Sequence, residues 1–330
     1  MKSLRMIENR TRSYGIDLAR SIAIVGVVLI HSGSFANGRF GVQLFFLVSG
    51  YLLADLGNLS SRDFLIRRAF RLFPLYWIIL IIFYRGDFHS IWQLMASLSL
   101  IQGIHWVFYS IPGAWSISNE WLFSLLLPFF RRAKKNQLIG LIALSWSSQF
   151  LASFFVHRWG GLLTTDSVEM AALKVWVNTF NPAINLAFLL IGVGLKRGYI
   201  PILKNKLIGL LIIILGQALG YFVGHDLLFM WPPILWAIFS ICLDWSPRYQ
   251  ILKFAINFIG QRTYGIFFIH FIILEYVKSN GVIKNVPEEF GLQNILIFLL
   301  TLGISALLSE VSWRFIENPS IKFSKRFISR

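Results

Sequence analysis

Residues 16–34, IDLARSIAIVGVVLIHSGS, form an apolar run of the length that crosses a membrane. A membrane-spanning helix needs about 20 mostly apolar residues. The chain has eleven runs near that length, at 16–34, 40–57, 72–84, 91–109, 114–130, 138–156, 180–195, 207–223, 227–243, 257–277 and 293–315. The sequence therefore predicts an all-α, polytopic integral membrane protein.

The composition excludes a soluble globular protein. Of the 330 residues, 56% are hydrophobic and only 14% are charged, and the mean hydropathy is +0.65. Soluble domains are about a quarter charged. The formal net charge of +16 would suggest nucleic acid as a partner in a soluble chain, but in a membrane chain the side on which the basic residues fall comes first. The single cysteine, Cys242, excludes an intrachain disulfide.

The basic loops set the topology. If all eleven runs crossed, the basic clusters at 62–71 and 131–135 would lie on opposite sides of the membrane, against the positive-inside rule. The run 91–109 is the most polar candidate between them and leads into Pro112-Gly113. We interpret it as a re-entrant or interfacial helix, which leaves about ten transmembrane helices.

Ten crossings put both termini on the same side of the membrane, which we expect to be the cytoplasm. We expect a multi-pass protein of the cytoplasmic (inner) membrane. About 23 basic residues then lie on the cytoplasmic side, including the loops at 58–71 and 131–137, and about 6 lie outside. Topology thus explains the positive charge, and no nucleic-acid partner is expected. We divide the chain into a cytoplasmic N-terminal tail (1–15), a membrane domain (16–318) and a cytoplasmic C-terminal tail (319–330). The stretch 157–179 is expected to face outward.

The first predicted helix carries three ionisable side chains, Asp17, Arg20 and His31. Ionisable groups inside a membrane are costly and are functional candidates by default. Arg20 and His31 are eleven residues apart, so they share one helical face roughly 16 Å apart along the axis. Asp17 lies three residues before Arg20 and can pair with it. The alternative is an ion-paired helix end and a histidine that only bonds a neighbour.

Polar residues in the next segments are further candidates. Ser49-Gly50 in an apolar helix permits close backbone approach, which packing alone would also explain. Arg68 and Arg71 share a face if their segment is helical and form a fork of donors suited to phosphates. Contacts with anionic lipid headgroups are the alternative for these arginines. Glu120 is embedded among aromatic residues in WSISNEWLF, residues 115–123, which Trp115 opens.

The run 257–277 carries Tyr264 and His270, which are six residues apart and therefore lie on different helical faces. A hydrogen-bonding role in the core is the alternative for His270. No cluster of His, Cys or carboxylate residues has metal-ligand spacing, so no metal site is expected. The chain also has no phosphate-binding P-loop and no G-x-S-x-G nucleophile elbow.

Six segments, in this order, resemble the integral-membrane acyltransferase family 3. They are YGIDLARSIAIVGVVLIH (14–31), GVQLFFLVSGYLL (41–53), RRAFRLFPLYW (67–77), WSISNEWLF (115–123), GQRTYGIFFIH (260–270) and WRFIENP (313–319). The resemblance covers about residues 13–319, and its most telling element is Arg20-x10-His31. It implies a core of about ten helices and transfer of acyl groups, often acetyl, from cytoplasmic acyl-CoA to sugars or other extracytoplasmic hydroxyls.

Three positions depart from the family pattern. An acid is frequent where Gln43 stands, two adjacent acids are common where Asn119-Glu120 stand, and a tyrosine often stands where Ser124 follows Phe123. Glu120 is thus the sole carboxylate at its site.

The residues and the resemblance together predict a membrane O-acyltransferase that acts on a carbohydrate acceptor. Its catalytic residues are expected to be His31 and Glu120. His31 would act as general base, and Glu120 or another polar neighbour would orient the His31 ring. Acyl-CoA, expected to be acetyl-CoA, is a co-substrate rather than a bound cofactor; membrane lipid is the other partner. An acyl-histidine intermediate stays open. The expected acyl-CoA ligands are Arg20, Arg68 and Arg71, and the further candidates are Asp17, Ser49, Trp115, Tyr264 and His270.

Two functions from other classes remain as alternatives. A transporter or flippase of a sugar or lipid-linked saccharide would use the same buried charges, but inverted repeats with paired interrupted helices, which favour it, are not visible. A non-catalytic membrane scaffold is the second alternative.

Overall fold

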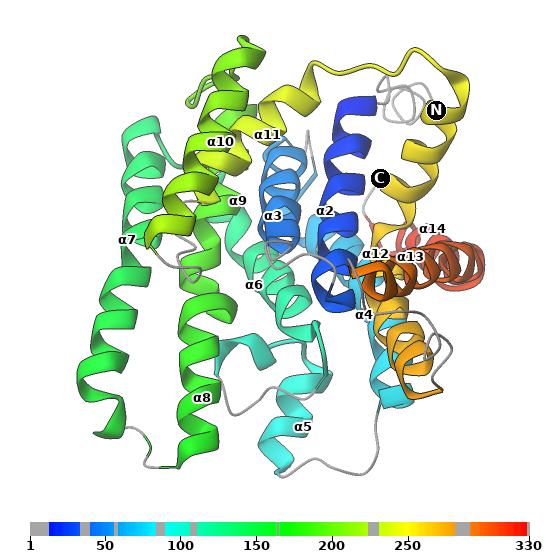
Figure 1. Cartoon of the computed structure of the whole chain (residues 1–330), viewed down its shortest axis with the longest axis horizontal. Coiled ribbons are helices and arrows are strands. Elements are labelled where there is room, and N and C mark those ends of the chain that lie inside the picture. The colour runs from blue at the N-terminus through cyan, green and yellow to red at the C-terminus, as the bar shows by residue number, and fades with distance from the viewer. Residues whose placement is uncertain are drawn as a thin grey trace.

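The structure, a computed structural model, describes residues 13–33, 40–55, 59–83, 90–105, 111–162, 164, 166–223, 231–280 and 291–328. These residues form helices and no strands, as the sequence predicts (Figure 1). The helices of two turns or more are α2 (Tyr14–Ser32), α3 (Phe40–Leu53), α4 (Ser61–Phe83), α5 (Ile91–Leu98), α6 (Ala114–Phe130), α7 (Lys135–Trp159), α8 (Ser167–Val175), α9 (Pro182–Lys196), α10 (Lys206–Val223), α11 (Trp231–Leu243), α12 (Gln250–Ser279) and α13 (Leu292–Ser312). Shorter helical pieces are η2 (Gln102–Ile104), η4 (Gly160–Leu162), η5 (Trp176–Phe180), η8 (Trp313–Glu317) and α14 (Asn318–Ser324).

Within the described residues, four helical stretches are long and apolar enough to cross a membrane. They are Tyr14–Ser32, Lys135–Trp159, Ser167–Lys196 and Leu292–Ser324. Three shorter apolar helices are Phe40–Leu53, Lys206–Leu219 and Trp231–Leu243. The prediction of a helical membrane protein is confirmed at this level, and the ten-crossing topology stays a prediction.

Helix α4 begins well before the apolar run that was predicted to start at residue 72. Ser60 provides its N-terminus, where the hydroxyl accepts a hydrogen bond of 3.1 Å from the backbone N–H of Asp63. The expected loop at 58–71 is therefore mostly helix, and Arg68 and Arg71 lie on α4. A hydropathy window misses this start because its charged residues lower the mean hydropathy, although the fold buries two of them, Asp63 and Arg68.

The segment predicted to be re-entrant or interfacial contains only the short helices α5 and η2 among its described residues. The eight residues of α5 are about 12 Å long at 1.5 Å per residue, far less than the bilayer core of about 30 Å. The segment is fastened to α4, because the Tyr76 hydroxyl donates to the carbonyl of Ser97 at 2.9 Å and accepts from Gln102 Nε2 at 3.1 Å. The re-entrant or interfacial placement of this segment stays a prediction; residues 106–110 lie outside the described residues.

Two expected polar segments also contain helix. Helix α7 runs on to Trp159, and α8 starts after Asp166, whose side chain accepts hydrogen bonds from Val168 and Glu169 N–H. Within the predicted C-terminal tail, α14 packs on α4, where the Ser320 hydroxyl donates to the Phe70 carbonyl at 2.7 Å. The predicted N-terminal tail lies almost wholly outside the described residues.

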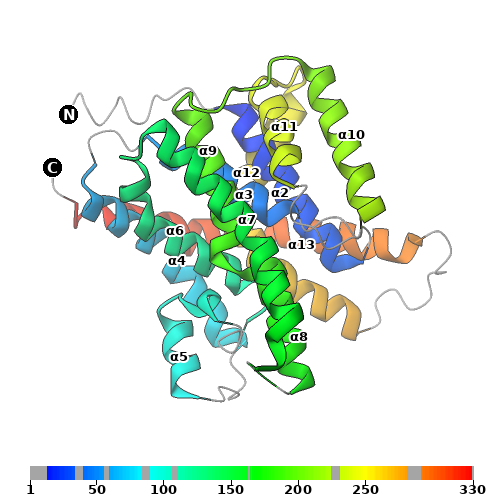
Figure 2. The same cartoon turned by 90° about the vertical axis from the view of Figure 1, so that its left-hand side faces the viewer.

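Helices α3 and α9 cross with their backbones in direct contact (Figure 2). A Cβ atom on Gly50 would collide with the carbonyl oxygen of Leu189, and one on Gly192 would collide with that of Leu47. Small residues at such crossings let membrane helices gain dispersion contacts over a long line of backbone. This crossing fixes α3, and so fixes the neighbouring Ser49, at the centre of the molecule.

Helix α2 lies in the middle of the fold, against α3, α11, α12 and α13 (Figure 1). It contributes to two separate clusters of buried apolar side chains, with Ala19 and Ala23 in one and Ile24, Val27 and Val28 in the other. Its polar residue Arg20 lies where side chains of α3, α4, α6 and α12 meet.

Candidate active site

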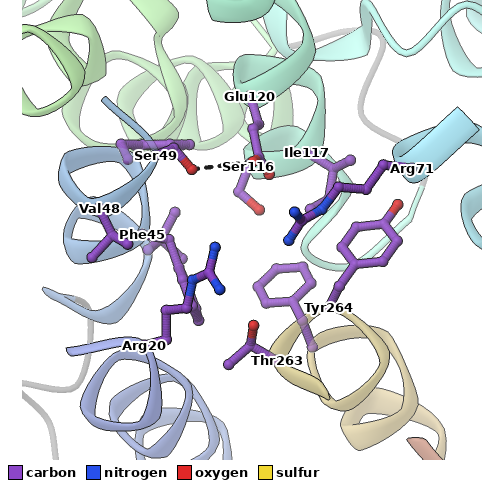
Figure 3. A pocket seen from close by; sticks show the side chains of 13 residues that line it. Arg20, Phe45, Val48, Ser49, Arg71, Ser116, Ile117, Glu120, Thr263 and Tyr264 are labelled. Atoms are coloured by element: carbon purple, nitrogen blue, oxygen red, sulfur yellow. Dashed lines mark hydrogen bonds between the residues drawn. The ribbon is translucent and has the colours of Figure 1, made fainter. Parts of the chain in front are cut away.

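A cavity of about 50 Å³ lies among α2, α3, α4, α6 and α12 (Figure 3). That volume holds a few water molecules, so a donor as large as acyl-CoA requires its lining side chains to rearrange. The side chains that line it are Arg20, Val42, Phe45, Phe46, Val48, Ser49, Arg71, Ser116, Ile117, Glu120, Thr263, Tyr264 and Phe267.

Two guanidinium groups face the cavity. Figure 3 shows Arg20 reaching in from α2 and Arg71 from α4, with Glu120 beside them on α6. Asp17 is buried with its carboxylate 4.0 Å from Arg20, as the predicted pairing requires. Cations held in a poorly hydrated space attract anions more strongly than cations in water. The cavity is therefore suited to negative charge at its arginine side.

Arg68 lies behind the cavity rather than in it. Its Nη2 donates to Glu120 Oε1 at 2.5 Å and its Nε donates to the Ser124 hydroxyl at 3.1 Å. Glu120 Oε1 also accepts from the Ser49 hydroxyl at 3.2 Å. A buried ion pair is tolerated when further hydrogen bonds satisfy its atoms. The predicted fork of Arg68 and Arg71 is thus divided, and only Arg71 faces the cavity.

His31 lies beside His270 and outside the cavity lining. The two ring centroids are 5.2 Å apart, and His31 Nδ1 is 3.3 Å from His270 Nε2. His31 is exposed, whereas His270 is fully buried. The hydrogen bonds described for the Glu120 carboxylate go to Arg68 and Ser49, and the side chain that hydrogen-bonds the His31 ring is His270.

One aromatic residue contacts both places. Phe267 lines the cavity that Arg20 and Arg71 face, called the arginine cavity below. It also packs edge-on against His270, with ring centroids 5.9 Å apart. The cavity and the histidine pair are therefore neighbours across one side chain, along the α2 face that carries Arg20 and His31.

The model of the acyltransferase domain family, acyltransferase family 3, matches residues 13–310. The chain belongs to this family. Membership confirms the predicted resemblance to a family of acyltransferase domains, and the apolar helices agree with the membrane character of that family.

The related proteins carry O-acetyltransferase names. O-acetyltransferase OatA of Staphylococcus aureus (strain NCTC 8325 / PS 47) is 24% identical over 357 residues, which cover 92% of this acyltransferase chain and 56% of OatA. A second protein of Staphylococcus aureus (strain COL), provisionally named an O-acetyltransferase, is 24% identical over 356 residues with the same shares covered. The chain thus spans just over half the length of these relatives. No solved structure matches it.

The remaining candidates of this acyltransferase occupy different places. Tyr264 lines the cavity, while its hydroxyl donates to the Leu72 carbonyl at 2.6 Å. Trp115 is nearly buried, stacks on Phe180 at 4.5 Å and lies edge-on to Phe46. It therefore supports the first turn of α6 rather than lining the cavity.

Sequence reasoning missed three residues near the site. Ser116 and Thr263 line the cavity, and each sits next to a residue that was singled out. Glu317 is 3% exposed, accepts a hydrogen bond of 2.9 Å from Ser312, and lies near enough to Arg71 for their charges to interact. Its signal was the motif WRFIENP, in which no residue was assigned a role. The π-helical turn η8, which carries it, is a form often found at functional sites.

Proposed function

We propose that this protein is a membrane O-acyltransferase that moves an acyl group, expected to be acetyl, from acyl-CoA to a hydroxyl of a carbohydrate. The carbohydrate is extracytoplasmic or linked to the membrane. The observation that carries the proposal is the meeting of Arg20 and Arg71, from two different helices, at a cavity beside a histidine pair. Family membership and the O-acetyltransferase names of the relatives support the same chemistry.

The donor is a polyanion with a thioester at the end of a long flexible arm. Arg20 and Arg71 provide donors for its phosphate oxygens, and guanidinium groups suit phosphates because they bond through two N–H groups at once. The arm then extends along the face of α2 toward His31. Arg68 serves this step indirectly, since its pairing with Glu120 holds the cavity wall on α6.

His31 serves as the general base. An alcohol that attacks a thioester must lose its proton, and imidazole takes up protons near neutral pH. In direct transfer the oxygen–acyl bond forms as the carbon–sulfur bond breaks, and the proton passes to His31 and then to the departing thiolate. A covalent acyl-histidine is the second route by which the same residue can act.

The topology proposed for this reaction has both termini in the cytoplasm and the protein in the cytoplasmic membrane. Arg20 then lies nearer the cytoplasmic face, where acyl-CoA is made available, and His31 lies nearer the outer face, where the acceptor arrives. The excess of basic residues in the loops of one side supports this orientation.

A thiol-release assay tests the activity. Purified full-length protein in lipid nanodiscs receives acetyl-CoA and a mixture of cell-envelope glycans, and free thiol is measured beside a His31→Ala variant. We expect thiol release that His31→Ala abolishes. Binding of saccharide without thiol release in either protein would favour the transporter instead. Glycan mass analysis of cells with and without the protein would then identify the acceptor by a lost acyl mass.

A further inference from the structure

We propose that His270 is a positioning residue that, together with the Val27 carbonyl, fixes the tautomer of His31, so that Nε2 of His31 is the atom that accepts the proton. This inference rests on the proposed function, in which His31 is the general base. It concerns the contact between His31 on α2 and His270 on α12, two residues that are 239 positions apart in the sequence.

Two backbone carbonyls determine where the protons lie. His31 Nδ1 is 2.8 Å from the carbonyl oxygen of Val27, and His270 Nδ1 is 3.2 Å from that of Ile266. A carbonyl oxygen only accepts hydrogen bonds. Both Nδ1 atoms must therefore carry the hydrogen, and in the neutral rings both Nε2 atoms carry the lone pair.

The contact between the rings fits the same assignment. The His31 Nδ1–H donates a bifurcated hydrogen bond to the Val27 carbonyl oxygen and to His270 Nε2, which lies 3.3 Å from Nδ1. Three-centre bonds of this kind are common at helix termini, and His31 lies in the last turn of α2. The opposite tautomers would direct two nitrogen lone pairs at two carbonyl oxygens, a repulsion at both ends of the pair.

The assignment leaves the other nitrogen of His31 available. Within the described residues, the hydrogen bonds of the His31 ring are made through Nδ1, and the residue is exposed. In the transfer step, the acceptor O–H bond breaks, its oxygen bonds to the acyl carbon, and the proton joins Nε2. As the carbon–sulfur bond breaks, the thiolate leaves and later takes this proton.

His270 favours the protonated product of that step. Once His31 is an imidazolium, its Nδ1–H makes charge-assisted hydrogen bonds, which are about twice as strong as neutral ones. His270 is 0% exposed and is held by Phe267 and Phe271, whose ring centroids lie 5.9 Å and 4.0 Å from its own. A neutral imidazole thus fills the place that a carboxylate fills in a Ser-His-Asp triad.

The tautomer can be measured without any activity. With 15N-labelled histidine in the full-length protein, and His31→Ala to assign the signals, NMR distinguishes protonated from unprotonated ring nitrogens. We expect neutral His31 to be protonated at Nδ1 and unprotonated at Nε2. In His270→Phe, which keeps an aromatic ring but has no acceptor, we expect a larger share of the Nε2–H tautomer than in wild type, because only the Val27 carbonyl then accepts from Nδ1–H. Wild-type His31 protonated at Nε2 would overturn the proposal.

Kinetics provide the second readout. We expect His270→Phe to lower kcat at least about tenfold and to leave KM for acetyl-CoA unchanged, because the donor binds at the arginine cavity. His270→Gln, whose amide oxygen can accept from Nδ1–H, should recover most of kcat, and His157→Gln on the exposed end of α7 is the matched control. Equal loss in the Gln and Phe variants would overturn the proposal. Failure of the proposed function is a separate outcome: the His31→Ala protein would be active, while His31 of the wild-type protein would still be protonated at Nδ1.

Discussion

Arg68 on α4 donates a 2.5 Å hydrogen bond to the carboxylate of Glu120 on α6, and both side chains are largely withdrawn from solvent. Removing one partner of a buried pair leaves the other charge uncompensated, at a cost of about 3–5 kcal/mol. We therefore expect Arg68→Gln to lower the thermal stability of the detergent-purified protein strongly.

A double-mutant cycle tests that reading of the pair. The variant Arg68→Gln/Glu120→Gln should be more stable than the sum of the single changes predicts, with a coupling of roughly 0.5–3 kcal/mol. Strict additivity would show that the two residues act independently. A folded Glu120→Gln protein that is inactive, beside an active His31 variant, would move the base to Glu120.

Arg71 faces the cavity and should act on donor binding instead. Hydrogen bonds to charged groups contribute about 1.5–3 kcal/mol, so we expect Arg71→Gln to weaken acyl-CoA binding by about tenfold or more in calorimetry. Arg71→Lys should recover part of the affinity, and added salt should reduce the difference. Arg132→Gln, outside the cavity lining, is the control. The same loss in both Gln variants would make general surface charge or lipid contact the better account.

His31→Ala should abolish transfer while the protein stays folded, since an exposed imidazole leaves little packing to lose. Loss of a general base costs roughly 100- to 10,000-fold in rate. Single-turnover thiol release beside a thermal unfolding curve measures both properties. A rate within tenfold of wild type would contradict the role.

The α3–α9 crossing predicts a sharp contrast between two glycines. Gly192→Leu should destabilise the protein, because even a Cβ atom would meet the carbonyl of Leu47, and overpacking costs about 1–3 kcal/mol or more. Gly140→Ala in α7 meets nothing within 4 Å and should raise helix stability by up to about 1 kcal/mol. Thermal unfolding of both variants, in the same detergent, is the measurement; equal stabilities would refute the crossing.

The ten-crossing topology predicts which residues a membrane-impermeant thiol reagent reaches. In a Cys242→Ala background, we expect a cysteine at Lys135 to be labelled only after the membrane is opened. A cysteine at Ser167 should be labelled in intact cells. Outside labelling at Lys135 would refute the topology. Cys242 is buried and adds no signal of its own.

The sequence by itself determined the class of protein and the apolar part of most helices, but not the start of α4 or the position of α8. Apolar runs of spanning length predict membrane helices because hydrocarbon excludes unpaired backbone groups. The spacing of Arg20 and His31 predicts one shared face because 3.6 residues per turn is a local property of the helix. The polar residues in 91–109 predict a re-entrant or interfacial helix for the same kind of reason, since they interrupt the apolar run.

Only the tertiary structure decided which side chains meet. Arg68 and Arg71 share a sequence motif, yet one pairs with Glu120 and the other lines the cavity, because each faces a different neighbouring helix. His31 on α2 contacts His270 on α12, which is 239 residues later in the sequence, and Gly50 contacts the backbone of Leu189. Such contacts depend on how whole helices cross and rotate against one another, and no periodicity within a single helix records that.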